Sequence, residues 1–341
     1  MTVAATPIAF VRAMVAAYER RGMNPSGALR QAQITPSDLR QPHGHITARQ
    51  MEALSAAAMQ ELDDEALGAF SRRLPWGSYG MLARASLTAP TLGVALRRWC
   101  RHHALLANDI VLSVSVADAV ATVAVDERAS LGHIGPGGRE FCLVHVLRNI
   151  HGLACWYVDS RIGLRQARFP FAAPPHAEAY PLLFPAPITF DAARAEIRFD
   201  ADYLALPLRR DERALRQMLQ RALPLTVLPY RRDRLLVQQV RQVLAAHPDQ
   251  THNADQVAAL LATSARTLHR QLRQEGATLQ ALKDEVRRER AIELLQRTHK
   301  PVKQVAEATG FQNEKSFIRA FRQWTGTGPG AFRKRAGGGD F

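Results

Sequence analysis

Two copies of one short pattern in the last third of the chain constrain its fold more than any other sequence feature. Each copy has a short apolar helix, a tight turn, and a second short helix that begins after a residue favoured at helix N-termini, Ser264 in one and Asn313 in the other. The pattern predicts two helix-turn-helix units. On each second helix, two apolar residues one helical turn apart face inward, namely Leu268 with Leu272 and Phe317 with Phe321.

The opposite face of each second helix carries long cationic side chains. Arg266, His269, Arg270 and Arg273 form this stripe in the first copy, and Lys315, Ile318, Arg319 and Arg322 lie 49 residues later in the second. A single stripe of this kind is usually a solvated helix face. Its repetition behind two matching cores favours two helices that enter the major groove of DNA.

We expect these side chains to divide into two groups. The base-reading group comprises Arg266, His269, Arg270, Lys315 and Arg319, because guanidinium and similar groups pair with base edges. The phosphate-binding group comprises Arg273, Arg322, Lys300 and Lys303, which position the protein without reading sequence. A long helix over 279–296 would hold the two units on successive major grooves, about 34 Å apart.

The stretch from Asn253 to Arg333 resembles the DNA-binding domain of the AraC/XylS regulators. The motifs that carry the resemblance are Ala262-Thr263-Ser264-Ala265-Arg266-Thr267-Leu268-His269-Arg270, Glu289-Arg290-Ala291, Gly310-Phe311, and Phe317 to Pro329 with Ala320-Phe321-Arg322-x-Trp324-Thr325-Gly326 inside it. Two positions depart from that pattern. Ala262 replaces the usual turn glycine, at a cost of about 1 kcal/mol if the backbone there is left-handed, and Thr309 replaces a leucine.

The distribution of charge agrees with a polyanionic partner. The formal net charge is +14. The 112 residues from Tyr230 onward hold 20 basic and 11 acidic side chains, whereas the other 229 residues hold 25 and 20. A basic excess concentrated in the helical region favours nucleic acid over an anionic membrane surface.

The rest of the chain predicts a separate α+β domain with a small, antiparallel sheet. We place this domain at 1–223, a linker at 224–230, and the all-α domain with the two helix-turn-helix units at 231–341. The Pro-rich stretch at 170–187 excludes a central strand. Helices are expected at 8–21, from a capping box at Thr47 onward, at 79–87, 91–105, 140–158 and about 211–223. Strands are expected at 109–115 and 119–125, which form a β-hairpin around a short turn at Ala117–Asp118, and at 164–169 and 196–199.

This first domain is similar to the N-terminal domain of an AraC subfamily that includes ornithine-utilisation regulators. The resemblance rests on Trp76-Gly77-Ser78-Tyr79-Gly80, Ser86-Leu87-Thr88-Ala89-Pro90 with the following Thr91-Leu92-Gly93, and Phe199-Asp200-Ala201-Asp202-Tyr203. It implies a domain that senses a small effector, differs from a cupin barrel, and belongs to a dimeric activator that works with RNA polymerase.

Seven residues combine aromatic walls with polar groups in the way small-molecule pockets do. The alternative for each is a structural role in the core, and for the one arginine an ion pair with a protein carboxylate. These effector candidates are Trp76, Tyr79, Trp99, His103, His145, Arg148 and Trp156.

Other classes of function find little support in the sequence. The histidine pairs at 43/45 and 102/103 lack the spacing of a metal site, and the glycine-rich stretch at 135–138 lacks the Lys-Ser/Thr of a phosphate loop. We therefore expect no enzyme activity, metal or cofactor. The three cysteines predict buried thiols, and the absence of a membrane span or secretory segment predicts a cytoplasmic protein.

Two alternatives to a sequence-specific regulator remain open. One is an architectural protein that binds any DNA sequence through phosphate neutralisation. The other is an RNA-binding module, although the basic region lacks the exposed aromatics that such modules place on a sheet.

Overall fold

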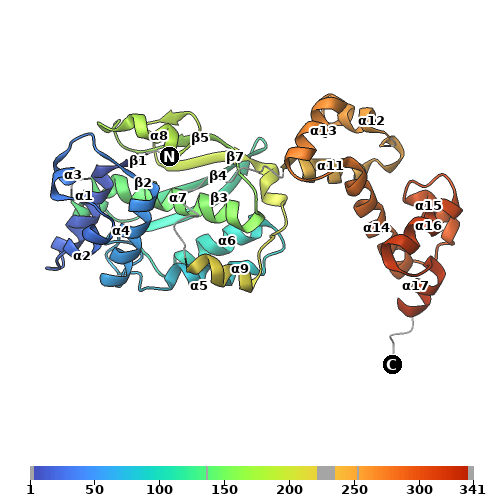
Figure 1. The fold of residues 1–341 in the computed structure, drawn as a ribbon, viewed down its shortest axis with the longest axis horizontal. Coiled ribbons are helices and arrows are strands. Elements are labelled where there is room, and N and C mark those ends of the chain that lie inside the picture. The colour runs from blue at the N-terminus through green and yellow to red at the C-terminus, as the bar shows by residue number, and fades with distance from the viewer. Residues whose placement is uncertain (1–3, 136, 221–234, 252, 337–341) are drawn as a thin grey trace. The chain divides into compact units, whose positions relative to one another are not determined.

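The computed structural model describes residues 4–135, 137–220, 235–251 and 253–336. It divides into two compact units, Met1–Asp233 and Arg234–Phe341 (Figure 1). The predicted linker at 224–230 lies outside the described residues, so the proposed domain boundaries stay a prediction.

The first unit begins with short helices around a two-stranded sheet. The capping box predicted at Thr47 is confirmed, since its side chain accepts a hydrogen bond from the Gln50 backbone and the Gln50 side chain returns one. The antiparallel strand pair escaped sequence analysis. The elements are β1 (Ala4–Pro7), α1 (Ile8–Glu19), α2 (Ser26–Gln31), α3 (Pro36–Arg40), β2 (His45–Thr47) and α4 (Ala48–Glu61).

A five-stranded sheet forms the centre of the first unit, in the order β3-β4-β7-β5-β6. The sheet is open, which agrees with a non-cupin domain. The predicted small antiparallel sheet is confirmed, and one parallel pair, β5 with β6, is added at its edge. The strands are β3 (Ile110–Ala117), β4 (Val120–Glu127), β5 (Leu164–Arg168), β6 (Ile188–Thr189) and β7 (Ala195–Asp200).

The hairpin between β3 and β4 turns one residue later than predicted. Ala117 pairs with Val120, so Asp118 and Ala119 form the two-residue turn. Both have positive φ, 49° and 58°, as a type I′ turn requires. This turn matches the twist of the flanking strands, which fixes the register.

The long helix α7 (Gly138–Val158) lies against β4 and β7 and supplies much of the core. Fifteen of its residues are buried. A helix buries this many residues only when other elements surround it. The other helices of this unit are α5 (Ser78–Leu87), α6 (Leu92–His103), α8 (Tyr180–Leu183) and α9 (Glu212–Leu219). The predicted α+β class is confirmed.

Two histidines of the first unit are kept neutral by their surroundings. Burial lowers the pKa of His103 to about 4, and burial together with the charge of Arg148 lowers the pKa of His145 to about 4. His103 is 1% exposed. Protonating either ring in the folded state would place a charge in a poorly solvated position.

The second unit is all-helical, as predicted, and contains two separate cores. Val257, Leu268 and Leu272 belong to the first core, and Phe317 with Phe321 to the second. The long helix α14 contributes Leu279 and Leu282 to the first core and Ala291, Leu294 and Leu295 to the second. The helices are α11 (Leu235–Ala246), α12 (Ala254–Leu260), α13 (Ala265–Gln274), α14 (Leu279–Arg297), α15 (Val302–Ala308), α16 (Glu314–Thr325) and α17 (Pro329–Ala336).

The turns of the two helix-turn-helix motifs confirm how the sequence departs from the family pattern. Ala262 has φ 50° and Gly310 has φ 76°, so alanine occupies a left-handed position in the first helix-turn-helix turn and glycine occupies one in the second. Thr309 is buried, and its hydroxyl donates to the Val305 carbonyl at 2.8 Å or the Ala306 carbonyl at 3.0 Å. A buried hydroxyl paired in this way is compatible with a position that leucine usually takes.

We predict that Ala262→Gly stabilises the second unit by about 1 kcal/mol, because glycine has no Cβ to strain the left-handed backbone. Urea unfolding followed by helical circular dichroism measures the change. Ala281→Gly, an exposed alanine inside α14, is the matched control and should lower stability by about 1 kcal/mol. A destabilising Ala262→Gly would contradict the strain argument.

We also predict that the first unit loses stability as the pH falls from about 6.5 to about 4. In that window the unfolded chain binds a proton at His103 while the folded protein does not, so the free energy of unfolding falls by about 1.4 kcal/mol per pH unit. Urea titrations at several pH values measure the slope. In the His103→Leu variant, the slope of unfolding free energy against pH should correspond to about one proton fewer. An unchanged slope would show that His103 protonates freely in the folded protein.

Candidate nucleic-acid interface

The helix α13 is positioned by its cap and its buried face. The Ser264 side chain accepts a hydrogen bond from the Thr267 backbone at 3.2 Å and so defines the first turn. Leu268 and Leu272 are at most 1% exposed. Because these leucines fix which face is inward, the four predicted contact residues all project into solvent, namely Arg266, His269, Arg270 and Arg273.

The helix α16 repeats this construction with aromatic residues in the core. The Asn313 side chain accepts from the Ser316 backbone at 2.8 Å, and Phe317 and Phe321 are fully buried. The predicted residues Lys315, Arg319 and Arg322 are exposed. Ile318 does not belong to the solvent-facing stripe, because its side chain is half-buried against the second core.

Lys300 and Lys303 lie at the start of the second helix-turn-helix unit. Both side chains are exposed, Lys300 in the connection after α14 and Lys303 in the first turn of α15. The Arg333 guanidinium on α17 donates to the Lys300 carbonyl at 2.6 Å, which anchors the backbone of this connection. The exposed amines are thus carried on an ordered segment beside α16.

The cations on α13 and α16 have no carboxylate partner among the described residues, unlike Arg241 on α11 and Arg290 and Arg297 on α14. Arg241 pairs with Glu285 at 2.5 Å and with Glu289 at 2.6 Å. On α14, Arg290 pairs with Glu293 at 2.9 Å. These ion pairs therefore offset positive charge on α11 and α14, and the positive charge of α13 and α16 stays available to an anion.

Arg287 is a residue that sequence analysis missed. It lies on α14, its guanidinium carbon is 5.0 Å from the centre of the Phe311 ring, and it donates to the Gly310 carbonyl at 3.2 Å. Burial lowers its pKa. Because it joins α14 to the turn before α16, it helps to set the orientation of that helix. No sequence motif marks it.

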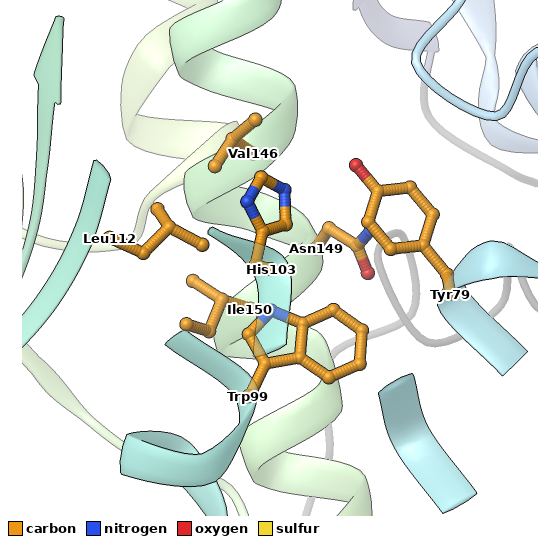
Figure 2. A pocket seen from close by; sticks show the side chains of 7 residues that line it. All are labelled: Tyr79, Trp99, His103, Leu112, Val146, Asn149 and Ile150. Carbon is orange, nitrogen blue, oxygen red and sulfur yellow. The ribbon is translucent and has the colours of Figure 1, made fainter. Parts of the chain in front are cut away.

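The effector candidates separate into two groups in the first unit. Tyr79, Trp99 and His103 come together around one small pocket (Figure 2). The Tyr79 ring stacks on Trp99 at 5.7 Å between centroids and on His103 at 6.3 Å. Sequence analysis missed the other lining residues, which are Leu112, Val146, Asn149 and Ile150.

The other four candidates do not line this pocket. Trp76 is 49% exposed, and Trp156 is buried, with the Arg210 guanidinium 5.6 Å from its ring centre. His145 stacks on Phe141 at 5.4 Å. Arg148 is half-buried, and desolvation lowers its pKa to about 10.

His103 has an unusual environment for a buried side chain. Neither of its ring nitrogens has a hydrogen-bond partner among the described residues. Leaving a buried polar atom unpaired costs about 1–3 kcal/mol. The fold therefore carries a cost at this position that packing alone does not explain.

Three further observations concern other classes of site. Cys100, Cys142 and Cys155 are buried thiols, as predicted. Within the described ranges, no cluster of three or more histidine, cysteine or carboxylate side chains is arranged to hold a metal ion. Of the helices that the structure describes, none has the length and apolar character needed to cross a membrane.

Comparisons with known proteins assign both units. Residues 22–208 match the family described as the arabinose-binding domain of AraC transcription regulator, N-terminal, and residues 257–335 match a helix-turn-helix domain. The ornithine utilization regulator of Pseudomonas aeruginosa is 26% identical over 329 residues, which cover 96% of either chain. The regulator VqsM of the same organism is 37% identical over 98 residues, covering 29% of this chain and 30% of that one.

Among solved structures, the transcriptional regulator CdpR of Pseudomonas aeruginosa is 24% identical, covers 93% of this chain and 98% of its own, and has a TM-score of 0.36. The first family match alone spans more than half of the 341 residues. Its relatives are transcription regulators rather than enzymes. The chain belongs to the AraC family of transcription regulators, with an arabinose-binding-type N-terminal domain and a helix-turn-helix C-terminal domain.

Proposed function

We propose that this protein recognises specific DNA sequences through α13 and α16 and that a small molecule bound by its N-terminal domain modulates its activity. The observation that carries the proposal is the pair of exposed cationic faces without carboxylate partners in the described residues. Both faces lie opposite a buried core, so each helix presents its cations outward as a unit.

The individual roles follow from where each side chain lies on its helix. Arg266, His269 and Arg270 lie within the first six of the ten residues of α13, toward the N-terminal part of a recognition helix, which contacts base edges. Lys315 and Arg319 occupy the matching positions of α16. The remaining cations suit phosphates because they lie later on the helices or on the adjoining connection, and they are Arg273, Arg322, Lys300 and Lys303.

Sequence-specific readout is preferred to architectural binding because of the chemistry of these faces. Arginine pairs bidentately with guanine, and histidine can hydrogen-bond to bases, whereas a protein indifferent to sequence needs only phosphate contacts. Arg266, His269 and Arg270 place such groups on three neighbouring positions of α13.

The remaining features of the proposal come from the family. We propose a cytoplasmic homodimer that activates transcription with RNA polymerase on double-stranded DNA, and domains at 1–223 and 231–341 joined by 224–230. Light scattering by the full chain, free and bound to DNA, tests the dimer, and a mass no greater than one chain in both cases would exclude it.

Replacing Arg270 and Arg319 with alanine should remove sequence preference. Each base contact contributes about 1–3 kcal/mol of discrimination, so the two together account for about 2–6 kcal/mol. Fluorescence anisotropy compares binding to DNA from the region upstream of the gene with binding to scrambled DNA. We expect the unmodified protein to prefer the upstream DNA by a hundredfold or more and the double variant to lose most of that preference.

The matched control is the double variant Arg290→Ala with Arg297→Ala, which removes the same charge from exposed positions of α14 that pair with Glu293. It should retain the preference for upstream DNA. Equal binding of both DNAs by the unmodified protein at every salt concentration would favour the architectural alternative instead.

We expect the double variant Arg273→Ala with Arg322→Ala to affect DNA binding differently from the variant that lacks Arg270 and Arg319. If these side chains contact phosphates, binding to upstream and scrambled DNA weakens by the same factor, and the slope of log Kd against log salt concentration falls by about 1 per lost contact. Anisotropy titrations at four salt concentrations measure both effects. A selective loss of binding to upstream DNA would reassign these residues to base reading.

A further inference from the structure

The pocket in Figure 2 lies wholly within the N-terminal unit, where α5, α6, β3 and α7 meet. Its space amounts to about 170 Å³, part of which is open to solvent, and no point between the side chains accommodates a water molecule. Tyr79 is half-buried in the first turn of α5 and stacks on the buried Trp99. The pocket is therefore narrow in this conformation.

His103 is the polar group at the centre of this pocket (Figure 2). It is 1% exposed, and neither ring nitrogen finds a partner in the part of the chain that the structure describes. Buried polar atoms in folded proteins are nearly always paired. Because the ring is almost fully buried, bulk solvent does not satisfy it.

The lining side chains define which ligand groups could pair with the His103 ring. Burial keeps His103 neutral, and a neutral imidazole offers one donor and one acceptor. The side-chain amide of Asn149 offers both as well. The other lining residues are apolar or aromatic, and Arg148, although next to Asn149 in the chain, does not line the pocket. A complementary molecule is uncharged, with an apolar body and adjacent donor and acceptor groups.

We propose that this pocket binds a small uncharged ligand of one apolar ring bearing an amide-like donor and acceptor, with His103 and Asn149 contacting its polar end. Leu112, Val146 and Ile150 surround the ring, and Tyr79 is the wall that the ligand displaces on entry. This proposal rests on the proposed effector function and supplies its site and ligand class.

Benzamide is a suitable probe, and benzoate and toluene are its comparators. Benzoate replaces the amide with a charged carboxylate, and toluene lacks the polar end. Calorimetry on the full chain at pH 7.5 should show saturable binding of benzamide in the millimolar range, and at least tenfold weaker binding of both comparators. Equal binding of benzoate, or no saturable binding of benzamide, would overturn the proposal.

Three variants assign the contacts. His103→Leu and Asn149→Leu should each weaken benzamide binding at least tenfold. His102→Leu, the neighbouring histidine that does not line the pocket, should leave it unchanged. If His103→Leu fails to fold, the Asn149 variant still tests the assignment. Retention of full affinity by the Asn149 variant would contradict it.

The Tm of the ligand-free protein provides a second readout. A histidine kept for a ligand is unsatisfied without it, so His103→Leu should raise the Tm. A histidine that only supports the fold should lower the Tm when replaced, and that result would overturn the proposal. Fluorescence anisotropy on the same samples distinguishes failure of this proposal from failure of the proposed function. A protein that prefers upstream DNA but does not bind benzamide would reject the ligand pocket and support DNA-binding regulation.

Discussion

The second unit depends on one helix that belongs to two hydrophobic cores. Leu282 and Ala291 of α14 are buried in different cores, nine residues apart, which corresponds to about 13 Å along a helix that rises 1.5 Å per residue. Each core fixes one recognition helix through the residues opposite its cations. The 19-residue α14 spans about 28 Å, comparable with the repeat of the major groove. Arg287, in the middle of α14, contacts Gly310 and Phe311 and so ties the second turn to the shared helix.

Sequence patterns predicted the features that depend on neighbours in the chain. The Thr47 capping box, the hairpin of β3 and β4 and both helix-turn-helix units follow from residues three to ten positions apart. The pairings of β1 with β2 and of β5 with β6 were missed because strands of two to five residues carry little periodicity and pair with partners distant in sequence. The hairpin turn was misplaced by one residue because alanine at 119 gives no signal for a positive φ.

The two candidate sites differ in how far the sequence could define them. A recognition helix presents its contact residues on one face, so spacing alone placed Arg266, Arg270, Lys315 and Arg319 in solvent. Only Ile318 was placed wrongly, because the apolar face of α16 includes Ile318 as well as the two phenylalanines. The effector candidates came from separate elements, and composition does not show which aromatics meet. Tyr79, Trp99 and His103 line one pocket, together with Asn149, which carries no distinguishing motif.

The two regions proposed to bind partners also contain arrangements that lower the stability of the free protein. Exposed cations at short spacing on α13 repel one another, and none of them has a carboxylate partner among the described residues, whereas Arg241 and Arg290 do. His103 leaves two buried nitrogens without partners. Natural sequences usually agree across local and global demands and depart from that agreement at functional sites. A DNA backbone would neutralise the cations of α13, and a ligand amide would pair with His103, so each departure is relieved by the partner proposed for it.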